Sequence, residues 1–336
     1  RVGDVVLTIP LIKKIKDSFP DAKIYFLANL YTKDILEKNE NLEAVLIVED
    51  SFAANYRNIK KYDIDTVISV NPSFKLALLF FFLRISTRVG TAYRWYSFLF
   101  NHKQHEHRRY GNKHEAEFNI NLLKALGISN NGEYDFGIKV TSDDDNTVNR
   151  LLVEKGLREK CALIIVHPGS GGSAMDLPIS SLKKLVQKLA DLKAVKICFT
   201  GIRTEWELIK ELNCAINNTG ITFVDELNLR ELSVLIKKSD LFISNSTGPI
   251  HIAAAVGTHV IGFYPPVRPM SEKRWGPFTG NKTVFVPSLR NEKVIDESNY
   301  CKKCLKTGCE HYSCMNQIDV GMVYQKIIEH ISKKRL

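Results

Sequence analysis

Short apolar segments typical of buried strands alternate with helical patterns along almost the whole chain. The strand-like segments are nearly continuous runs of β-branched and other apolar residues, which suits strands covered by helices on both faces. Between them, apolar residues recur at the three- and four-residue spacing of amphipathic helices. Because strands alternating with helices build parallel sheets joined by crossover helices, the pattern predicts an α/β fold. The expected strands are residues 22–29, 42–49, 65–70, 161–169, 194–201, 221–226, 240–245 and 259–266.

The chain length and one polar segment predict two domains. The 336 residues suit two cores of about 150 residues each. The polar run at 141–146 separates the two series of strands. We therefore predict two Rossmann-like, doubly wound domains, at 1–145 and 146–315, that face a central cleft, and a C-terminal helix at 316–336 that packs back across them. No apolar strand precedes Arg1, so we expect an incomplete N-terminus that lacks the first strand.

The charge balance favours anionic partners. The chain has 47 Lys and Arg residues against 37 Asp and Glu residues, a formal net charge of +10. Phosphorylated substrates, nucleic acid and an acidic membrane surface all fit that charge. The number of cysteines is odd, seven, which argues against a disulfide framework and for a reducing compartment. Together with the lack of a signal-like leader, this favours the cytoplasm. The apolar run at 76–83 is shorter than the roughly 20 residues of a membrane span; it reads as a buried helix, with contact at a membrane edge as the alternative.

Small polar residues follow several of the predicted strands. In parallel sheets, ligands bind beyond the carboxyl ends of the strands. The segment 244–257 contains two glycines and a proline before a short helix, in which Ser246 or Thr247 can cap the helix and Pro249 suits its first turn. Gly248 would let a ligand approach the free amides at the helix start. A capped helix with nothing bound is the alternative, but the glycine-rich loop at 167–173 favours a nucleotide diphosphate site.

Four segments together resemble glycosyltransferase family 9, the lipopolysaccharide heptosyltransferases, in order and spacing. The segments are 1–24, 167–172, 229–258 and 263–278. The resemblance implies a GT-B fold, a nucleotide-sugar donor held by the C-terminal domain and an acceptor held by the N-terminal domain. It also implies inversion at the anomeric carbon with neither metal nor cofactor. ADP-heptose as donor and a lipopolysaccharide core or related lipid-linked saccharide as acceptor are what this family implies.

The resemblance also assigns residues. Asp4 matches the general base of the family, and a carboxylate at a strand end can take a proton from an acceptor hydroxyl; an N-cap of the first helix is its structural alternative. Glu205 matches an acid that binds the ribose, with a first-turn helix acid as the alternative. The residues that match the donor-binding loops are Ser170, Gly171, Gly172, Ser246, Thr247, Gly248, Pro249 and His251.

The chain departs from the family pattern at three positions. Ser246 stands where members commonly carry Asp, Met175 where they carry Lys, and Leu177 where they carry Trp. A missing lysine removes positive charge that would offset the leaving diphosphate. A different nucleotide sugar and a non-catalytic nucleotide-sugar-binding protein therefore stay open, as does an epimerase or hydrolase on the same scaffold. The residues that could replace the charge, or form a solvated loop, are Arg268, Lys273 and Arg274.

A basic, aromatic-rich segment at 88–127 suits an acidic acceptor, because Arg and Lys bind carboxylates and phosphates. Nucleic acid is the rival partner, but no binding motif for it accompanies the charge. We expect no nucleic acid, and a peripheral position at the inner face of the cytoplasmic membrane. The acceptor-binding candidates are Arg88, Arg94, Lys103, Arg109 and Lys113.

Three groups of residues raise the question of a metal. The histidines at 102, 105 and 107 lack the spacing of a zinc site, and the acidic run at 142–146 reads as a helix cap and linker. Four cysteines near the C-terminus could hold a structural zinc, although free thiols are the favoured interpretation. These cysteines are Cys301, Cys304, Cys309 and Cys314.

Overall fold

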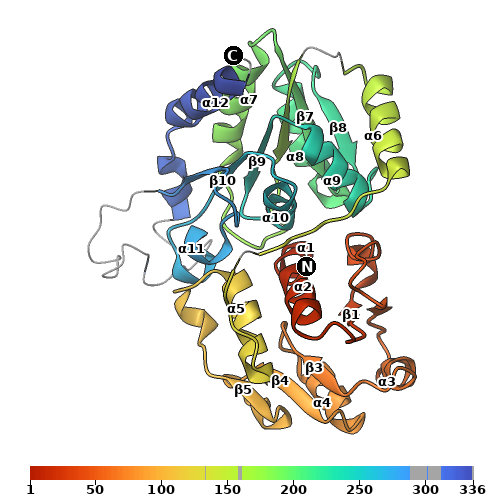
Figure 1. Ribbon diagram of the computed structural model, residues 1–336. Helices are drawn as coiled ribbons and strands as arrows, with labels where there is room; N and C mark the ends of the chain where they lie inside the picture. Colours follow the sequence, from red (N-terminus) through yellow and green to blue (C-terminus); the bar gives the residue numbers. More distant parts are fainter. Residues whose placement is uncertain (133, 158–160, 288–300, 302–311, 335–336) are drawn as a thin grey trace. The chain divides into compact units, whose positions relative to one another are not determined.

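The computed structural model describes residues 1–336 except 133, 158–160, 288–300, 302–311 and 335–336. The chain divides into two compact units, Arg1–Lys139 and Val140–Leu336 (Figure 1). The division precedes the expected boundary after residue 145, because helix α6 (Ser142–Glu154) packs on α9 (Leu229–Lys238) of the second unit. The acidic run at 142–146 is therefore the first turn of α6 and not a linker, with Thr141 and Asp144 forming its capping box.

The first unit contains five short strands in two parallel sheets, one of order β1-β2 and one of order β3-β4-β5. Strands β1, β2 and β3 lie within the segments predicted from sequence. Strands β4 and β5 were not predicted, because they carry polar residues instead of an apolar run. The elements are α1 (Val2–Val6), α2 (Ile9–Ser18), β1 (Tyr25–Ala28), β2 (Ala44–Ile47), α3 (Phe52–Lys60), β3 (Thr66–Ile68), α4 (Phe74–Phe82), β4 (Thr87–Thr91), β5 (His102–Gln104) and α5 (Glu115–Asn121).

The described part of the second unit contains one parallel sheet of six strands, in the order β11-β10-β9-β6-β7-β8. Five of these strands lie within predicted segments, and β11 was not predicted. Chain order runs one way from β6 to β8 and the other way from β9 to β11, so β6 and β9 flank a topological switch point. The remaining elements are β6 (Ala162–His167), α7 (Ile179–Ala190), β7 (Val195–Gly201), α8 (Trp206–Cys214), β8 (Ile221–Val224), β9 (Leu241–Asn245), α10 (Gly248–Ala255), β10 (Val260–Phe263), α11 (Glu272–Trp275), β11 (Lys282–Phe285) and α12 (Val320–Lys334).

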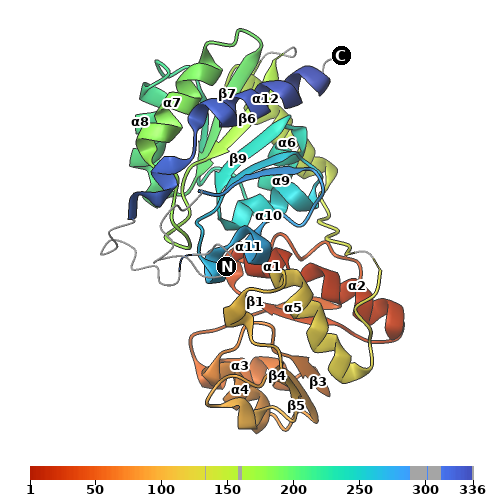
Figure 2. The same cartoon turned by 90° about the vertical axis from the view of Figure 1, so that its left-hand side faces the viewer.

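Helices cover both faces of the second sheet, with α7, α8 and α12 on one face and α9 and α10 on the other (Figures 1 and 2). The C-terminal helix α12 packs on α7 of the same unit, and its Val323 and Ile327 lie in the core there. Packing of this helix across both domains stays a prediction. Burying such side chains contributes about 1.5–3 kcal/mol each, which explains why an amphipathic helix lies on the apolar face of its own unit.

Within the described residues, no helix combines the length and the apolar character that crossing a bilayer requires. The apolar run at 76–83 belongs largely to α4, which buries Ala77, Leu79 and Phe80 and leaves other aromatic side chains exposed. The prediction of a buried helix therefore holds for one side of α4 only.

Candidate active site

The loops that follow β6 and β9 are joined directly at the switch point of the second sheet. The hydroxyl of Ser173 donates hydrogen bonds to the carbonyl oxygens of Ser170 (2.7 Å) and Ser246 (3.0 Å). The amide of Asn245 donates to the carbonyl of Pro168 at 2.6 Å. These bonds bring together two polar loops that are more than 70 residues apart in sequence. The edge of the sheet at which doubly wound folds bind their ligands is thus built by these two loops.

Helix α10 begins in the second of these loops with its amides uncovered by a capping side chain. Thr247 occupies the N-cap position but makes no side-chain capping bond, and Gly248 and Pro249 form the first turn. Ser246, the other expected cap, instead hydrogen-bonds with the Tyr264 hydroxyl. A helix start without a hydroxyl cap leaves backbone donors and the positive end of the helix dipole for an anion. His251 is buried in the same helix.

The glycine-rich loop after β6 is shaped by left-handed backbone. Gly171 and Gly172 have φ values of 56° and 73°, which side chains rarely adopt, so glycine suits both positions. Both residues are exposed to solvent. Their amides therefore lie in a loop that a ligand can approach closely.

Glu205 lies against this loop. It ends a short 3-10 turn before α8, and its Oε2 accepts a hydrogen bond from the Ile202 amide at 3.1 Å. A backbone hydrogen bond from Gly171 also reaches this carboxylate. Burial raises the pKa of Glu205, while these hydrogen bonds lower it. Glu205 thus lies in the turn before α8, which agrees with the alternative of a helix-start acid, and it also contacts the glycine loop.

Two titratable residues near Glu205 were not singled out from sequence. Desolvation raises the pKa of Asp176 to about 6, and the charge of Glu205 acts in the same direction, although Asp176 keeps access to solvent. Burial lowers the pKa of His167 to about 4, and its Nδ1 lies 3.0 Å from the Thr200 hydroxyl. His167 is therefore neutral at pH 7. In the sequence, only the place of His167 at the end of a strand and of Asp176 after the glycine-rich loop pointed to them.

The positions that depart from the family pattern differ in their surroundings. Met175 and Leu177 are both buried in the core of the second unit, so neither side chain offers a charge or an exposed ring to a ligand. The amide of Leu177 donates to Asn245 Oδ1 at 2.8 Å, which fixes the segment against the loop after β9. Ser246 lies at the start of α10.

The basic segment after β10 is tied to that same loop. Arg268 lies in a 3-10 turn, while Lys273 and Arg274 lie on α11. The Tyr264 hydroxyl, which contacts Ser246, donates to the carbonyl of Trp275 on α11 at 3.0 Å. This contact holds the basic segment near the start of α10, although Arg274 itself also donates to the Pro269 carbonyl at 3.4 Å.

In the first unit, Asp4 lies at the third position of α1 and not at its N-cap. Burial raises the pKa of Asp4; the charge of Glu115 raises it further, and the charges of Arg1 and Arg108 lower it. Arg108 forms an ion pair with the buried Glu115 at the start of α5. Asp4 is therefore a partly buried carboxylate near a second carboxylate whose charge is paired.

The five acceptor-binding candidates differ in what they contact. The guanidinium of Arg88 donates to the carbonyls of Leu99 (2.8 Å) and Ile85, so it holds two turns together. Arg94, Lys103 and Arg109 are exposed. Lys113 donates to Glu106 Oε1 at 2.7 Å. Arg88 thus has a structural role, and the three exposed residues are open to a ligand.

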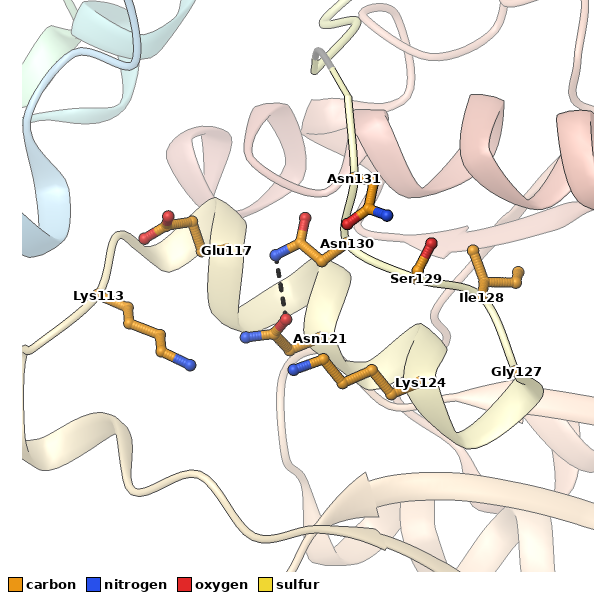
Figure 3. A pocket seen from close by; sticks show the side chains of 9 residues that line it. All are labelled: Lys113, Glu117, Asn121, Lys124, Gly127, Ile128, Ser129, Asn130 and Asn131. Atoms are coloured by element: carbon orange, nitrogen blue, oxygen red, sulfur yellow. Dashed lines mark hydrogen bonds between the residues drawn. The ribbon is translucent and has the colours of Figure 1, made fainter.

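Lys113 lines an open pocket of about 540 Å³ beside α5 (Figure 3). A polar network runs along the pocket, because Asn121 donates to Glu106 (2.9 Å) and accepts from Asn130 at 3.0 Å. Burial opposes ionisation of Glu106, but hydrogen bonds from Lys113 and Asn121 outweigh it and lower its pKa. The lining residues are Lys113, Glu117, Asn121, Lys124, Gly127, Ile128, Ser129, Asn130 and Asn131.

The cysteine cluster lies only partly within the described residues. Cys314 is buried in the core of the second unit, and Cys301 is partly buried. Cys304 and Cys309 lie outside the described residues. Among the residues that are described, no group of three His, Cys, Asp or Glu side chains could hold a metal ion.

The chain is similar to known proteins of one family. The family model described as "Glycosyltransferase family 9 (heptosyltransferase)" matches residues 53–309. Lipopolysaccharide heptosyltransferase 3 of Escherichia coli K12 is 25% identical over 304 residues, which are 84% of each chain. A family 9 glycosyltransferase of Veillonella parvula superposes with a TM-score of 0.81 at 18% identity, covering 99% of this chain and 95% of that one.

A second solved structure, the ADP-heptose lipopolysaccharide heptosyltransferase II of E. coli, has a TM-score of 0.79 at 17% identity and covers 100% of this chain and 97% of its own. The likeness confirms the predicted GT-B class with two Rossmann-like domains. With the family model spanning most of the sequence, the chain belongs to glycosyltransferase family 9, the heptosyltransferase family, and is a glycosyltransferase.

Proposed function

We propose that this chain transfers heptose from ADP-heptose to a lipopolysaccharide core or related lipid-linked saccharide, with inversion and without a metal ion. The observation that carries the proposal is the joined pair of loops at the switch point, with the uncapped start of α10 beside the glycine loop. This is the arrangement that a sugar-nucleotide diphosphate needs. Relatives named as ADP-heptose heptosyltransferases support the choice of donor.

The second unit binds the donor in this proposal. Amides at the start of α10 and in the glycine loop bind the diphosphate oxygens, apart from the amide of Gly171, which donates to Glu205. The carboxylate of Glu205 also accepts hydrogen bonds from the ribose hydroxyls. The backbone donors stabilise the negative charge that develops as the diphosphate leaves. Arg268, Lys273 and Arg274 add positive charge on the segment that Tyr264 ties to this loop. These groups do the work that a metal ion does in other transferases.

Asp4 acts as the general base. Its carboxylate takes the proton from an acceptor hydroxyl as that oxygen forms a bond to the anomeric carbon of the sugar. The bond from the anomeric carbon to the diphosphate oxygen breaks on the opposite face, and its electron pair leaves with ADP. Burial raises the pKa of Asp4, which makes its carboxylate a stronger base than an exposed aspartate.

The acceptor side of the reaction is assigned to the first unit. Arg94, Lys103 and Arg109 are exposed cations that suit phosphates and carboxylates of an acidic saccharide. Such an acceptor is anchored in a lipid leaflet, so the enzyme works at the inner face of the cytoplasmic membrane in this proposal.

A different nucleotide sugar is the second candidate, and the buried side chain of Met175 favours it. Where the family carries a lysine, this chain places a thioether in the core, so one positive charge near the donor loops is missing. A different nucleotide sugar, one that binds at this edge of the sheet without that positive charge, would fit the change. A non-catalytic binding protein fits it as well.

Thermal stabilisation by ADP, UDP, GDP and CMP separates these candidates, because a ligand that binds the native state raises the melting temperature. We expect a shift with ADP alone, followed by transfer from ADP-heptose to a core saccharide. A shift with another nucleotide would assign another donor. Binding of ADP with no transfer to any acceptor would identify a non-catalytic member.

A further inference from the structure

We propose that an exposed aromatic surface of the first unit docks on an anionic lipid bilayer. The surface consists of Phe74, Phe81 and Phe82 on α4 with Trp95 and Phe98 in the turn after β4. The exposed fractions of these residues are 40%, 49%, 55%, 73% and 69% in that order. Large aromatic side chains that gather at such exposure mark an interaction site and are not ordinary surface scatter.

Four of these rings form two contacting pairs, and the fifth lies in a turn that packs on the same helix. Positions 74 and 81 project from nearly the same side of α4, because residues seven apart are two turns apart on a helix, and position 82 lies next to them toward α3, where its ring contacts Phe52. The ring centroids of Phe74 and Trp95 are 4.6 Å apart, and those of Phe81 and Phe82 are 6.1 Å apart. Phe98 lies in the 3-10 turn 97–99, which packs on α4.

The charge around the surface identifies the occupant. Residues 66–105, which include α4 and the turn after β4, contain five lysines and arginines and no carboxylate. Three cations are exposed here: Lys75 on α4, Arg84 just after the end of α4, and Arg94 beside Trp95 in sequence. Anionic leaflets attract segments of this kind, and aromatic rings settle at the level of the headgroups.

A second copy of this chain fits the surface less well than a bilayer does. A two-fold interface would place this basic segment against its own copy, so like charges would oppose each other. A membrane surface instead offers negative headgroups to the cations and acyl chains to the rings. The inference rests on the proposed function in one respect, since a lipid-linked acceptor lies in such a bilayer.

Co-sedimentation of the full chain with vesicles tests the proposal. We expect binding to vesicles of phosphatidylcholine and phosphatidylglycerol in equal parts, much weaker binding to phosphatidylcholine alone, and loss of binding as salt rises. The double variant Trp95→Ala/Phe98→Ala should bind the anionic vesicles at least about tenfold more weakly. Both side chains are mostly exposed, so the variant should fold, and its melting temperature checks this.

Trp206→Ala is the matched control, because Trp206 is an exposed aromatic residue in the second unit. It should leave vesicle binding unchanged. Tryptophan fluorescence gives a second readout: a blue shift on anionic vesicles that is lost in Trp95→Phe places Trp95 in the lipid. Binding that survives the double variant would overturn the proposal. Self-association that the double variant abolishes, without vesicle binding, would assign the surface to a second copy.

A transfer assay with a water-soluble acceptor that lacks its lipid separates this proposal from the function. The double variant should match the unchanged chain in that assay, because the aromatic surface takes no part in the chemistry. If the unchanged chain transfers no sugar there but binds vesicles as expected, the proposed function fails and the docking surface stands. If transfer occurs but no vesicle binds, only the docking surface is wrong.

Discussion

Gly169 and Glu205 occupy adjoining space in the proposed donor site: a Cβ added at Gly169 would lie 1.8 Å from Oε1 of Glu205. A side chain at Gly169 would fit only if the Glu205 carboxylate moved out of this position. The absence of a side chain at Gly169 therefore sets where Glu205 lies, and with it one wall of the glycine loop.

Gly169→Ala should displace the Glu205 carboxylate and weaken ADP binding by about tenfold or more, with a loss of stability of about 1–3 kcal/mol from overpacking. Isothermal titration with ADP and thermal unfolding measure the two effects. Gly280→Ala is the control, because a Cβ there meets no atom within 4 Å. Unchanged ADP affinity in Gly169→Ala would show that the position of Glu205 does not matter to the donor.

Asp4→Asn should reduce transfer about 10²–10⁴-fold and leave ADP binding unchanged, because it removes the proposed base without touching the second unit. Since burial raises the pKa of Asp4, the rate should rise with pH through a midpoint above the ordinary value of an aspartate. Steady-state rates across pH measure both effects. Asp17→Asn, at an exposed residue of α2, should leave rate and profile unchanged. A full rate in Asp4→Asn would assign the base elsewhere.

Met175→Lys should destabilise the protein by about 3 kcal/mol or more, because it places an ammonium group in an apolar core. Urea unfolding measures the loss, and Met175→Leu, which keeps the volume, should lose less than about 1.5 kcal/mol. A stable Met175→Lys variant with higher ADP affinity would show that the lysine of related enzymes can be restored here.

His167 should make stability depend on pH. Its pKa is about 4 in the folded chain against 6.5 for the exposed group, so below pH 6.5 the unfolded chain gains a proton that the folded chain does not. Stability should therefore be fully present above that pH and fall, by about 3 kcal/mol in total, as pH drops towards 4.

Urea unfolding of the unchanged chain and of His167→Asn over this range tests the dependence on pH. His167→Asn should lack the loss of stability that protonation of His167 causes at low pH. His102→Asn, at an exposed residue of β5, should still show it. Equal slopes in the unchanged chain and His167→Asn would contradict the burial effect.

The sequence by itself determined the class of fold and the order of the binding loops. The apolar runs that became β6, β7 and β9 are local patterns, and each polar loop follows one of them directly. Periodicity and loop composition depend on neighbouring residues only, so they are readable without a structure. The polar strands β4 and β5 lack that local pattern, which is why they were missed.

Only the tertiary structure decided which of these residues meet. The pairing of β6 with β9 brings Ser173 to the carbonyl of Ser246 across 73 positions of sequence, and the fold turns Glu205 to Gly169 and buries Met175 in the core. It also gives two arginines of the basic segment different roles: Arg88 donates to backbone carbonyl groups, whereas Arg94 is exposed. Burial and long-range contacts depend on how sheets and helices pack, and packing is a property of the whole unit that no local pattern contains.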